Sequence, residues 1–245
     1  MKKILSIMGI SLLMVTNGVF AQDVNKMTEK LKKSFPNLGV ESVSYVKDLN
    51  LYELTMAGNP AYGYTNENND YFLISGELID VKNKINYTKE NEFNKVKKFY
   101  KSLPTDKAIV VKYGKGTRSF AVFSDPDCPF CKTLDREIHT KLTTADITIY
   151  YYMNPLNIPG HEQAPLKAAK IWCDKDKGRA WVNWMLNGVL PTNDGTCKNP
   201  VSETKAFATK AGFNGTPTII FDNGYTAAQQ MTGEEILKAL NAKKP

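Results

Sequence analysis

The sequence predicts two folded parts, a small α+β unit followed by a larger α/β domain that carries a helical insertion. Three observations support this division. One amphipathic helix pattern precedes several short alternating runs, a lysine-rich helix ends at Pro104, and strand and helix patterns alternate after that proline. The composition, with 42% hydrophobic and 23% charged residues in 245, is that of a globular protein and excludes a disordered or collagen-like chain.

The chain begins with a pattern typical of a targeting segment. Lys2 and Lys3 precede an apolar run over residues 4–15, and Val19-Phe20-Ala21 offers the small-residue pattern of a cleavage site. We therefore expect residues 1–21 to be a signal peptide that is removed after Ala21 on export. An N-terminal core helix is the alternative, but adjacent lysines are an unfavourable start for a buried helix. No later apolar stretch is long enough to cross a bilayer, so we expect no stable membrane insertion.

Residues 22–88 are predicted to form the small α+β unit. Apolar residues first recur at helical spacing, at Val24, Met27, Leu31 and Phe35. The helix is expected to stop near Pro36, and short alternating runs then predict strands at 42–46, 51–56 and 71–74. A unit of this size buries only a modest core, so pairing with a second copy is one way to complete it.

Residues 89–103 predict a separate helix. Thr88 can cap its start, Glu90 lies in its first turn, and lysines gather toward its end, as the helix dipole favours. Pro104 closes it. We interpret it as a linker helix that precedes a domain over residues 104–245, with an ordinary helix inside one continuous domain as the alternative.

The domain after Pro104 alternates strand and helix patterns. The expected elements are strands at 108–112 and 119–123, a helix at 128–140, a strand at 147–152, a mostly helical region at 162–213 with a loop at 188–197, a strand at 218–222, a hairpin turn at Asn223-Gly224 with a second strand, and a final helix opened by a capping box of Thr232 and Glu235. This order is that of a thioredoxin-type domain with a helical insertion.

Four cysteines are present, Cys128, Cys131, Cys173 and Cys197. In an exported protein an even number first suggests structural disulfides, with three connectivities to choose from. The C-x-x-C spacing of Cys128 and Cys131 indicates either a short-loop redox disulfide or half of a zinc site. A zinc site made of all four fits poorly, because the gap before Cys173 is wide and a second C-x-x-C is absent. We expect neither a metal nor a cofactor.

Pro129 places Cys128 at the start of a helix. Proline fits the first helical position because its missing N–H costs nothing there, which leaves Cys128 as the cap with its sulfur against the amides of Phe130 and Cys131. These donors and the positive helix end favour the thiolate, so the pKa of Cys128 is expected below ~8.5. Cys128 is the predicted nucleophile, and Cys131, one turn further on the same face and less exposed, is the predicted resolving thiol.

The other residues around this motif are assigned structural roles. Asp125 and Asp127 would oppose thiolate formation if they faced the sulfur, but we expect them to be turn and capping residues. His139 at a helix end and His161 in a proline-rich loop are expected at the surface or at caps, outside helical reach of Cys128. Core packing of the insertion is expected for Trp172, Trp181 and Trp184.

Three segments stand out together, Phe123-Ser124-Asp125-Pro126-Asp127-Cys128-Pro129-Phe130-Cys131-Lys132, Ile171-Trp172-Cys173-Asp174-Lys175-Asp176-Lys177 and Gly215-Thr216-Pro217. In combination they closely resemble the periplasmic protein disulfide isomerases of the bacterial DsbC/DsbG family, over essentially the whole mature chain. The resemblance implies a cystatin-like N-terminal dimerisation domain at 22–88, a linker helix at 89–103 and a thioredoxin-like catalytic domain with a helical insertion at 104–245. It also implies a homodimer formed through residues 22–88.

Transferred residue by residue, the resemblance makes Cys128 the attacking thiol and Cys131 its redox partner. Pro129-Phe130 lies between them, and Thr216-Pro217 becomes the cis-proline loop beside them. The Pro129-Phe130 dipeptide is closer to the DsbG branch, whereas the threonine before Pro217 is closer to the DsbC branch.

The resemblance further implies that Cys173 and Cys197 form a structural disulfide. No cluster of polar catalytic residue types surrounds either cysteine in the sequence, which agrees with that role. One feature of thioredoxins is absent: Val122 stands where they carry a buried acid, six residues before the first cysteine.

The implied function is that of a periplasmic thiol:disulfide interchange protein, an isomerase or reductase that rearranges incorrect disulfides in misfolded or mis-oxidised exported proteins. Because an isomerase must begin reduced, a membrane thiol reductant of the DsbD type is implied as well. Two alternatives stay open, a dedicated thiol oxidase or reductase for one secretion or cytochrome-maturation client, and mainly a holdase chaperone. The net charge of +7 does not indicate nucleic acid binding, because the lysines are dispersed without interleaved aromatic residues.

Overall fold

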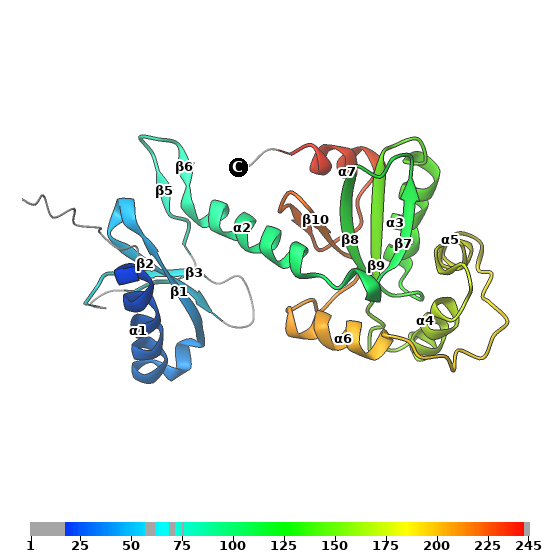
Figure 1. The fold of residues 1–245 in the computed structure, drawn as a ribbon, viewed down its shortest axis with the longest axis horizontal. Helices are drawn as coiled ribbons and strands as arrows, with labels where there is room; N and C mark the ends of the chain where they lie inside the picture. Colours follow the sequence, from blue (N-terminus) through cyan, green and yellow to red (C-terminus); the bar gives the residue numbers. More distant parts are fainter. Residues whose placement is uncertain (1–17, 57–61, 69–71, 75, 243–245) are drawn as a thin grey trace, which may run out of the picture. The chain divides into compact units, whose positions relative to one another are not determined.

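The computed structural model describes residues 18–56, 62–68, 72–74 and 76–242. The chain divides into two compact units, Met1–Glu77 and Leu78–Pro245, each built around its own sheet (Figure 1). Residues 1–17 of the predicted signal peptide lie outside the described residues. Helix α1 begins at Gly18, so the predicted cleavage site after Ala21 falls in its first turn.

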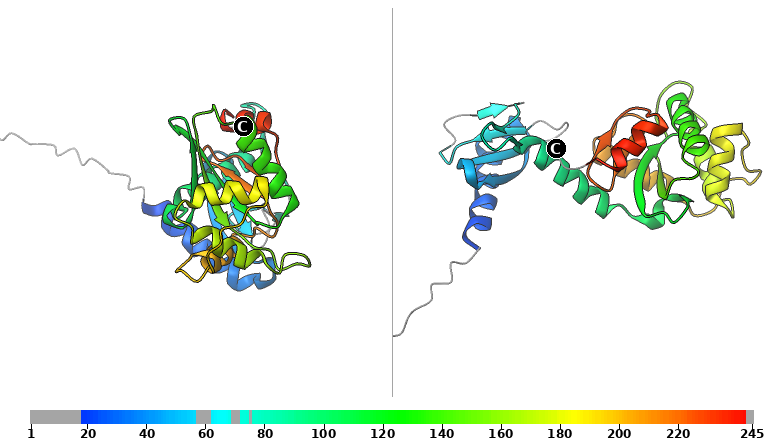
Figure 2. Two further views of the ribbon diagram at one scale, coloured as in Figure 1. Left: turned by 90° about the vertical axis from the view of Figure 1, so that its right-hand side faces the viewer. Right: turned by 90° about the horizontal axis from the view of Figure 1, so that it is seen from above.

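The N-terminal unit is one helix packed on an antiparallel sheet. It comprises α1 (Gly18–Ser34), β1 (Val40–Val46), β2 (Leu51–Met56), β3 (Tyr62–Thr65) and β4 (Phe72–Ile74), and the strands pair in sequence order. The helix and the sheet are seen in blue and cyan in the right-hand view of Figure 2. Met27 and Leu31 of α1 pack against Val43 and Leu54 of the sheet. The sequence-based expectation missed β3, because this short strand contains a glycine and shows no alternation of apolar residues.

The C-terminal unit starts with a small hairpin and a long helix. Strands β5 (Ile79–Asp80) and β6 (Ile85–Asn86) precede α2 (Tyr87–Ser102). Helix α2 begins earlier than predicted because Asn86, rather than Thr88, is its N-cap and accepts a 3.0 Å hydrogen bond from the Lys89 amide. The Thr88 hydroxyl instead accepts a 2.8 Å hydrogen bond from the Leu78 amide.

A mixed five-stranded sheet forms the centre of the C-terminal unit. It contains β7 (Ile109–Tyr113), β8 (Arg118–Ser124), β9 (Ile147–Met153), β10 (Thr218–Phe221) and β11 (Thr226–Ala227), in the order β11-β10-β8-β9-β7 (Figure 1). Strands β8 and β9 are parallel, and β7, β10 and β11 are antiparallel to their neighbours. Successive residues of β8 alternate between the two faces, so Val122 and Phe123 enter different cores.

Helices cover both faces of this sheet. On one face lie α3 (Pro129–Lys141), α5 (Lys177–Asn187) and α7 (Gly233–Leu240), which bury Leu134, Ile138, Trp181 and Ile236. The other face is covered by α2 and α6 (Val201–Lys210) through Phe99, Tyr100, Phe207 and Ala208. Together with α4 (Ala164–Trp172), helices α5 and α6 make up the predicted helical insertion. The predicted α+β unit followed by an α/β domain is confirmed.

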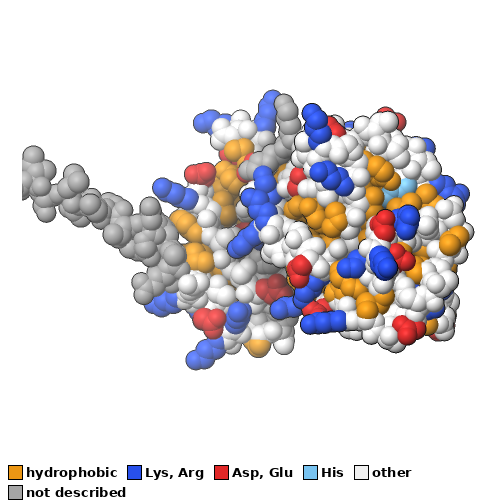
Figure 3. All heavy atoms as spheres, turned by 45° about the vertical axis from the view of Figure 1, so that its right-hand side comes forward, with side chains coloured by type: hydrophobic (Ala, Val, Ile, Leu, Met, Phe, Trp, Pro, Cys, Tyr) orange, Lys and Arg blue, Asp and Glu red, His pale blue; other side chains and the backbone are white. Residues whose placement is uncertain are grey.

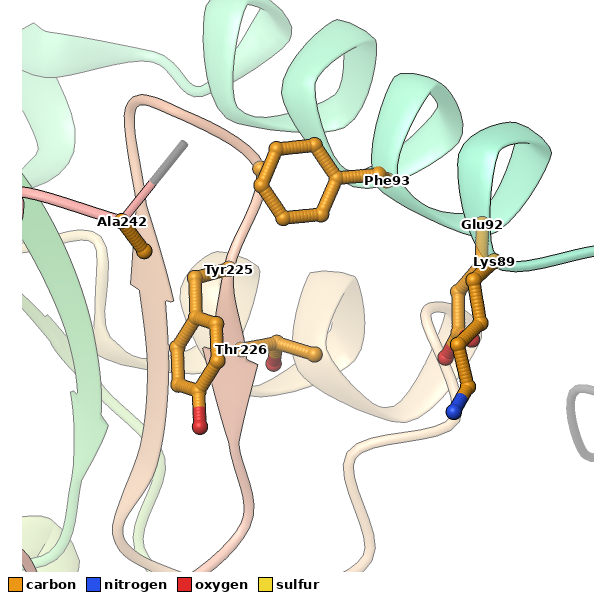
Figure 4. Close-up of a pocket in the computed structure, with 7 residues that line it drawn as sticks. Lys89, Glu92, Phe93, Tyr225, Thr226 and Ala242 are labelled. Carbon is orange, nitrogen blue, oxygen red and sulfur yellow. The ribbon is translucent and has the colours of Figure 1, made fainter. Parts of the chain in front are cut away.

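The β10–β11 hairpin packs against α2. It turns at Asn223-Gly224 as predicted, and Gly224 has a φ of +100°; a Cβ atom there would lie 2.5 Å from the Phe93 carbonyl oxygen, so glycine alone fits. A pocket beside this contact is lined by Lys89, Glu92, Phe93, Gly224, Tyr225, Thr226 and Ala242 (Figure 4). None of these residues belongs to the cysteine site described below.

Surface charges of both signs are mixed on the face shown in Figure 3, where Lys and Arg side chains alternate with Asp and Glu. None of the helices in the described part of the chain has the length and apolar character of a transmembrane segment.

Candidate active site

Three loops meet at one edge of the five-stranded sheet. Parallel pairing places Ser124 at the end of β8 beside Met153 at the end of β9. Strand β10 runs the opposite way, so Thr218 at its start lies beside Phe123. The loops that follow β8 and β9 and the loop that precedes β10 are therefore neighbours, although they are far apart in the sequence.

The loop after β8 leads directly into α3 and presents the two cysteines of the C-x-x-C motif. Cys128 is the N-cap of α3 and Pro129 its first residue, as predicted. Neither thiol is disulfide-bonded; Cys128 is 3% exposed and Cys131 is fully buried. Phe130 between them is 60% exposed. Pro129 and Phe130 are thus both exposed, directly beside a sulfur that is almost inaccessible to solvent.

The loop before β10 contacts Cys128 from the other side. The Cys128 thiol donates to the Thr216 carbonyl oxygen at 3.3 Å, and the Thr216-Pro217 peptide bond is cis. The structure therefore brings together six of the eight sequence-predicted site residues, Cys128, Pro129, Phe130, Cys131, Thr216 and Pro217.

The two thiols have opposite acidities. The pKa of Cys128 is lowered to about 6, chiefly because the Cys131 thiol donates to its sulfur, with further stabilisation of the thiolate by the Thr216 side chain and by the Cys131 and Phe130 amides. Burial acts against this shift but does not outweigh it. The pKa of Cys131 is strongly raised, first by burial and then by its partner Cys128. At neutral pH the pair is therefore one thiolate and one thiol.

Asp125, three residues before Cys128, is fully buried and holds the loop in shape. One carboxylate oxygen accepts a 2.7 Å hydrogen bond from the Asp127 amide, which confirms the predicted turn role. The other oxygen accepts from the Leu156 amide at 2.7 Å and contacts His161 Nδ1 at 2.7 Å. The expected surface or capping role of His161 is wrong, because its side chain is 11% exposed and pairs with this buried carboxylate.

Asp127, directly before Cys128, pairs with a residue of the insertion. Its Oδ1 lies 2.5 Å from Lys167 Nζ of α4. Trp184 of α5 also reaches this loop, and its indole N–H donates to the Pro126 carbonyl oxygen at 2.7 Å. Trp184 therefore does more than pack the insertion core, whereas Trp181 is fully buried as predicted.

Sequence reasoning missed His161, Lys167 and Trp184 as neighbours of Cys128. For His161 a signal existed, because it follows β9 and the ends of parallel strands share one edge of a sheet. For Lys167 and Trp184 no such signal exists, since their placement depends on how α4 and α5 pack.

A second polar cluster lies inside the domain, one turn beyond Cys131 on α3. Asp135 is fully buried and accepts from Trp181 Nε1 at 2.9 Å and contacts His139 Nε2 at 3.0 Å. The hydroxyls of Tyr151 and Tyr113 lie 3.0 and 2.7 Å from the two ring nitrogens of His139. The expected surface or capping role of His139 is therefore wrong as well. Its ring is enclosed because the aromatic side chains of β7, β9 and α5 converge on this part of α3.

Cys173 and Cys197 form a disulfide in the structure, with their Cα atoms 5.7 Å apart. Cys173 ends α4 and Cys197 lies in the loop before α6, so the bond closes the segment that contains α5. Neither cysteine belongs to the three loops at the sheet edge, and the four cysteines do not form one cluster.

Comparison with known proteins gives this arrangement a family. Residues 105–244 match the thioredoxin-like domain, and residues 19–89 match the N-terminal domain of disulfide bond isomerase proteins. The chain is a DsbC-type member of the thioredoxin-like family. The resemblance inferred from the cysteine and cis-proline motifs is thereby confirmed.

Individual relatives of this DsbC-type chain agree. It is 32% identical over 178 residues to a probable thiol:disulfide interchange protein DsbC of Bordetella avium, which covers 73% of this chain and 61% of the relative. It is 27% identical to the DsbC protein of Salmonella typhimurium, over 85% of this chain and 84% of the relative. The chain thus spans about three fifths of the Bordetella relative's length but most of the Salmonella one.

Among solved structures, a disulfide interchange protein from Neisseria gonorrhoeae superposes with a TM-score of 0.52 at 41% sequence identity. The match covers 58% of this chain and 100% of that chain.

Proposed function

We propose that the protein is a thiol:disulfide interchange enzyme that isomerises incorrect disulfides in exported proteins. The observation that carries this proposal is the pairing of a Cys128 thiol of low pKa with a buried Cys131 thiol of raised pKa, at a helix start beside the Thr216-Pro217 loop. The family matches of both parts of the chain support it.

In this reaction the Cys128 thiolate is the nucleophile. Its sulfur attacks one sulfur of a client disulfide, so a Cys128–client bond forms, the client S–S bond breaks, and the other client sulfur leaves as a thiolate. That thiolate can attack a second disulfide of the client. When a client thiolate finally attacks the mixed disulfide, Cys128 leaves as a thiolate, and the client has been rearranged with no net transfer of electrons.

Cys131 resolves the mixed disulfide when no client thiolate attacks it. Its thiol loses a proton, its sulfur attacks Cys128 Sγ, and the client leaves with both of its cysteines reduced. Two electrons have then passed from the enzyme to the client, and Cys128 and Cys131 are joined. A thiol reductant must return these electrons, and we infer a membrane protein of the DsbD type for this step.

The same proposal covers organisation and location. We infer that residues 1–21 direct export to the periplasm, that residues 22–88 form a homodimer, and that 89–103 and 104–245 are the linker helix and the catalytic domain. The modest core of the N-terminal unit and its match to the disulfide isomerase N-terminal domain support a dimer. N-terminal sequencing of the exported protein tests the cleavage site, and sedimentation of the mature chain against a variant beginning at Leu78, which keeps the C-terminal unit whole, tests the dimer.

The decisive experiment compares refolding of scrambled ribonuclease with reduction of insulin by the mature protein. We expect both activities, with the isomerase activity lost in a variant beginning at Leu78, which keeps α2 on the sheet, while insulin reduction persists. A dimer that refolds scrambled ribonuclease poorly but oxidises reduced ribonuclease quickly would identify a dedicated oxidase instead. Full cellular function in a Cys128→Ser strain would identify a chaperone.

A further inference from the structure

A buried negative charge lies directly beside the proposed nucleophile. The Asp127 side chain is only 8% exposed, and in the described part of the chain its Oδ2 has no hydrogen-bond partner. An uncompensated carboxylate at this position would oppose ionisation of the neighbouring Cys128. The Cys128 site therefore depends on whatever neutralises Asp127.

Lys167 supplies that positive charge. Its Nζ lies 2.5 Å from Asp127 Oδ1, and its side chain is itself largely buried. A long, mobile lysine side chain loses conformational entropy when it is held in one place, so a second contact is needed to fix the ammonium group.

Trp184 provides this second contact. The Lys167 ammonium lies 4.9 Å from the centroid of the Trp184 ring, within the range of a cation–π interaction, and the Lys132 ammonium lies 5.0 Å from the same ring. The indole N–H of Trp184 meanwhile donates to the Pro126 carbonyl oxygen at 2.7 Å. One side chain from α5 thus contacts the segment before Cys128, Lys132 of α3 and Lys167 of α4.

We propose that Trp184 is a positioning residue for Cys128: it holds Lys167 against Asp127 and fixes the Pro126 carbonyl, and so determines the electrostatic field in which the thiolate forms. This inference rests on the proposed function, because it takes Cys128 as the nucleophile. Trp184 touches neither the client nor the reacting sulfurs in this scheme and acts only through Lys167, Lys132 and Pro126.

Both acids of the segment before Cys128 have a basic partner from another part of the domain. Asp125 faces His161 from the loop after β9, Asp127 faces Lys167 from α4, and Lys132 of α3 lies over Trp184. The Gly215-Thr216-Pro217 loop adds no charged side chain. Each of the two acids thus has a basic partner, and Lys132 adds a positive charge on α3, which favours the thiolate.

The test measures the pKa of Cys128 in the reduced mature protein, from the pH dependence of its alkylation by iodoacetamide, with mass spectrometry of the Cys128 peptide. Lys167→Met should raise this pKa by about one unit. At pH values below the wild-type pKa, Cys128 should then be alkylated about tenfold more slowly. Asp127→Asn should lower the pKa by about one unit, because an unopposed lysine then faces the sulfur. The double variant should return close to the wild-type value.

Trp184→Leu should shift the pKa in the direction of Lys167→Met by roughly half a unit, a threefold effect, and Trp184→Phe should fall between, since it keeps a ring but loses the indole N–H. Trp172→Leu is the matched control, because Trp172 carries Lys177 at 4.0 Å over its ring in a pair that includes no residue of the Cys128 loop. Lys141→Met removes another paired lysine, at the far end of α3. Both controls should leave the Cys128 pKa unchanged.

Shifts of opposite sign for Lys167→Met and Asp127→Asn, together with a Trp184→Leu or Trp184→Phe shift in the direction of Lys167→Met, support the inference, and a loss of packing alone does not produce this combination. Equal shifts of the two charge variants in one direction, no shift in either of them, or an unchanged Cys128 pKa in the folded Trp184 variants overturn it. Should Trp184→Leu fail to fold, Trp184→Phe and the two charge variants still decide the matter. The readout does not require isomerase activity, so a protein that shows these shifts but does not refold scrambled ribonuclease contradicts the proposed function and leaves the role of Trp184 supported.

Discussion

The two cysteine pairs of this chain occupy opposite kinds of position. Cys128 and Cys131 lie in the first turn of a helix, carry unbonded thiols, and meet the ends of three chain segments. Cys173 and Cys197, 24 residues apart, are bonded to each other. Cys173 lies at the end of α4 and Cys197 in the loop before α6, so the bond joins the chain on either side of α5. What separates the pairs is that groups which stabilise a thiolate surround Cys128, whereas Cys173 and Cys197 are bonded to each other and do not ionise.

The difference shows why burial alone does not decide what a cysteine does. Cys131 is more deeply buried than Cys128, yet its raised pKa makes it the donor that lowers the pKa of Cys128. The low pKa of Cys128 therefore depends on Cys131 staying protonated. The Cys173–Cys197 bond instead limits the freedom of the unfolded chain. Four substitutions or conditions separate these roles.

The largest effect is expected from Cys128→Ser. This change removes the nucleophile, so insulin reduction and ribonuclease refolding should fall by roughly 10³-fold or more. Thermal unfolding of the variant checks that the fold is intact. Substantial residual turnover would mean that another thiol performs the reaction, and the comparison of the two pairs would be broken.

The double variant Cys173→Ser/Cys197→Ser should mainly lose stability. Opening a loop between cysteines 24 residues apart costs about 3 kcal/mol by chain entropy, which denaturant unfolding of the oxidised protein measures. Below its melting temperature the variant should keep the wild-type pKa of Cys128. A change in stability much smaller than this would show that the reduced segment around α5 is held by packing alone.

Cys131→Ala should raise the pKa of Cys128, because the strongest stabilising contact of the thiolate is lost. We expect about one unit, or a tenfold slower alkylation of Cys128 at pH 5. Mixed disulfides with clients should accumulate as well, since the resolving thiol is absent, and non-reducing gel electrophoresis detects them. An unchanged pKa of Cys128 would mean that the helix amides and Thr216, rather than Cys131, stabilise the thiolate.

The last comparison concerns the pH dependence of stability. The pKa of Cys128 is about 6 in the folded protein and ~8.5 in the unfolded chain, so its ionisation stabilises the reduced fold above pH ~8.5, and this contribution is lost as the pH falls to 6. The melting temperature of the reduced protein, relative to Cys128→Ser, should therefore decline over that window and level off below it. Above pH ~8.5 the raised pKa of Cys131 acts in the opposite direction, so the measurement stays below that value.

Much of the fold could be predicted because local signals agreed with packing. Pro129 after Cys128 defined the start of α3, and Asn223-Gly224 defined the β10–β11 turn. The start of α2 was misplaced because Asn86 and Thr88 are both good caps, and only the contact of Thr88 with Leu78 shows which one is occupied elsewhere. Local patterns do not resolve such competition.

The site was predictable for its sulfurs and much less so for its electrostatics. The C-x-x-C spacing identified the two thiols, but nothing near Cys128 in the sequence indicates that Lys167 and Trp184 reach its loop. His161 was misjudged for the same reason, because it meets Asp125 only once the domain has folded. His139 and Asp135 are four residues apart on α3, so their pairing is local, and the sequence-based expectation missed that this face of α3 is buried. Charge compensation between distant segments is a property of the tertiary structure.

The burial of Cys128 has a consequence for the client disulfides that the proposed reaction can reach. With 3% of this residue exposed, a disulfide must bend into a confined space to meet the sulfur. Disulfides in rigid, well-packed proteins lack this freedom to bend, whereas disulfides in flexible, incompletely folded chains have it. Under the proposed function, the disulfides of correctly folded proteins would thus escape attack by Cys128 for steric reasons alone.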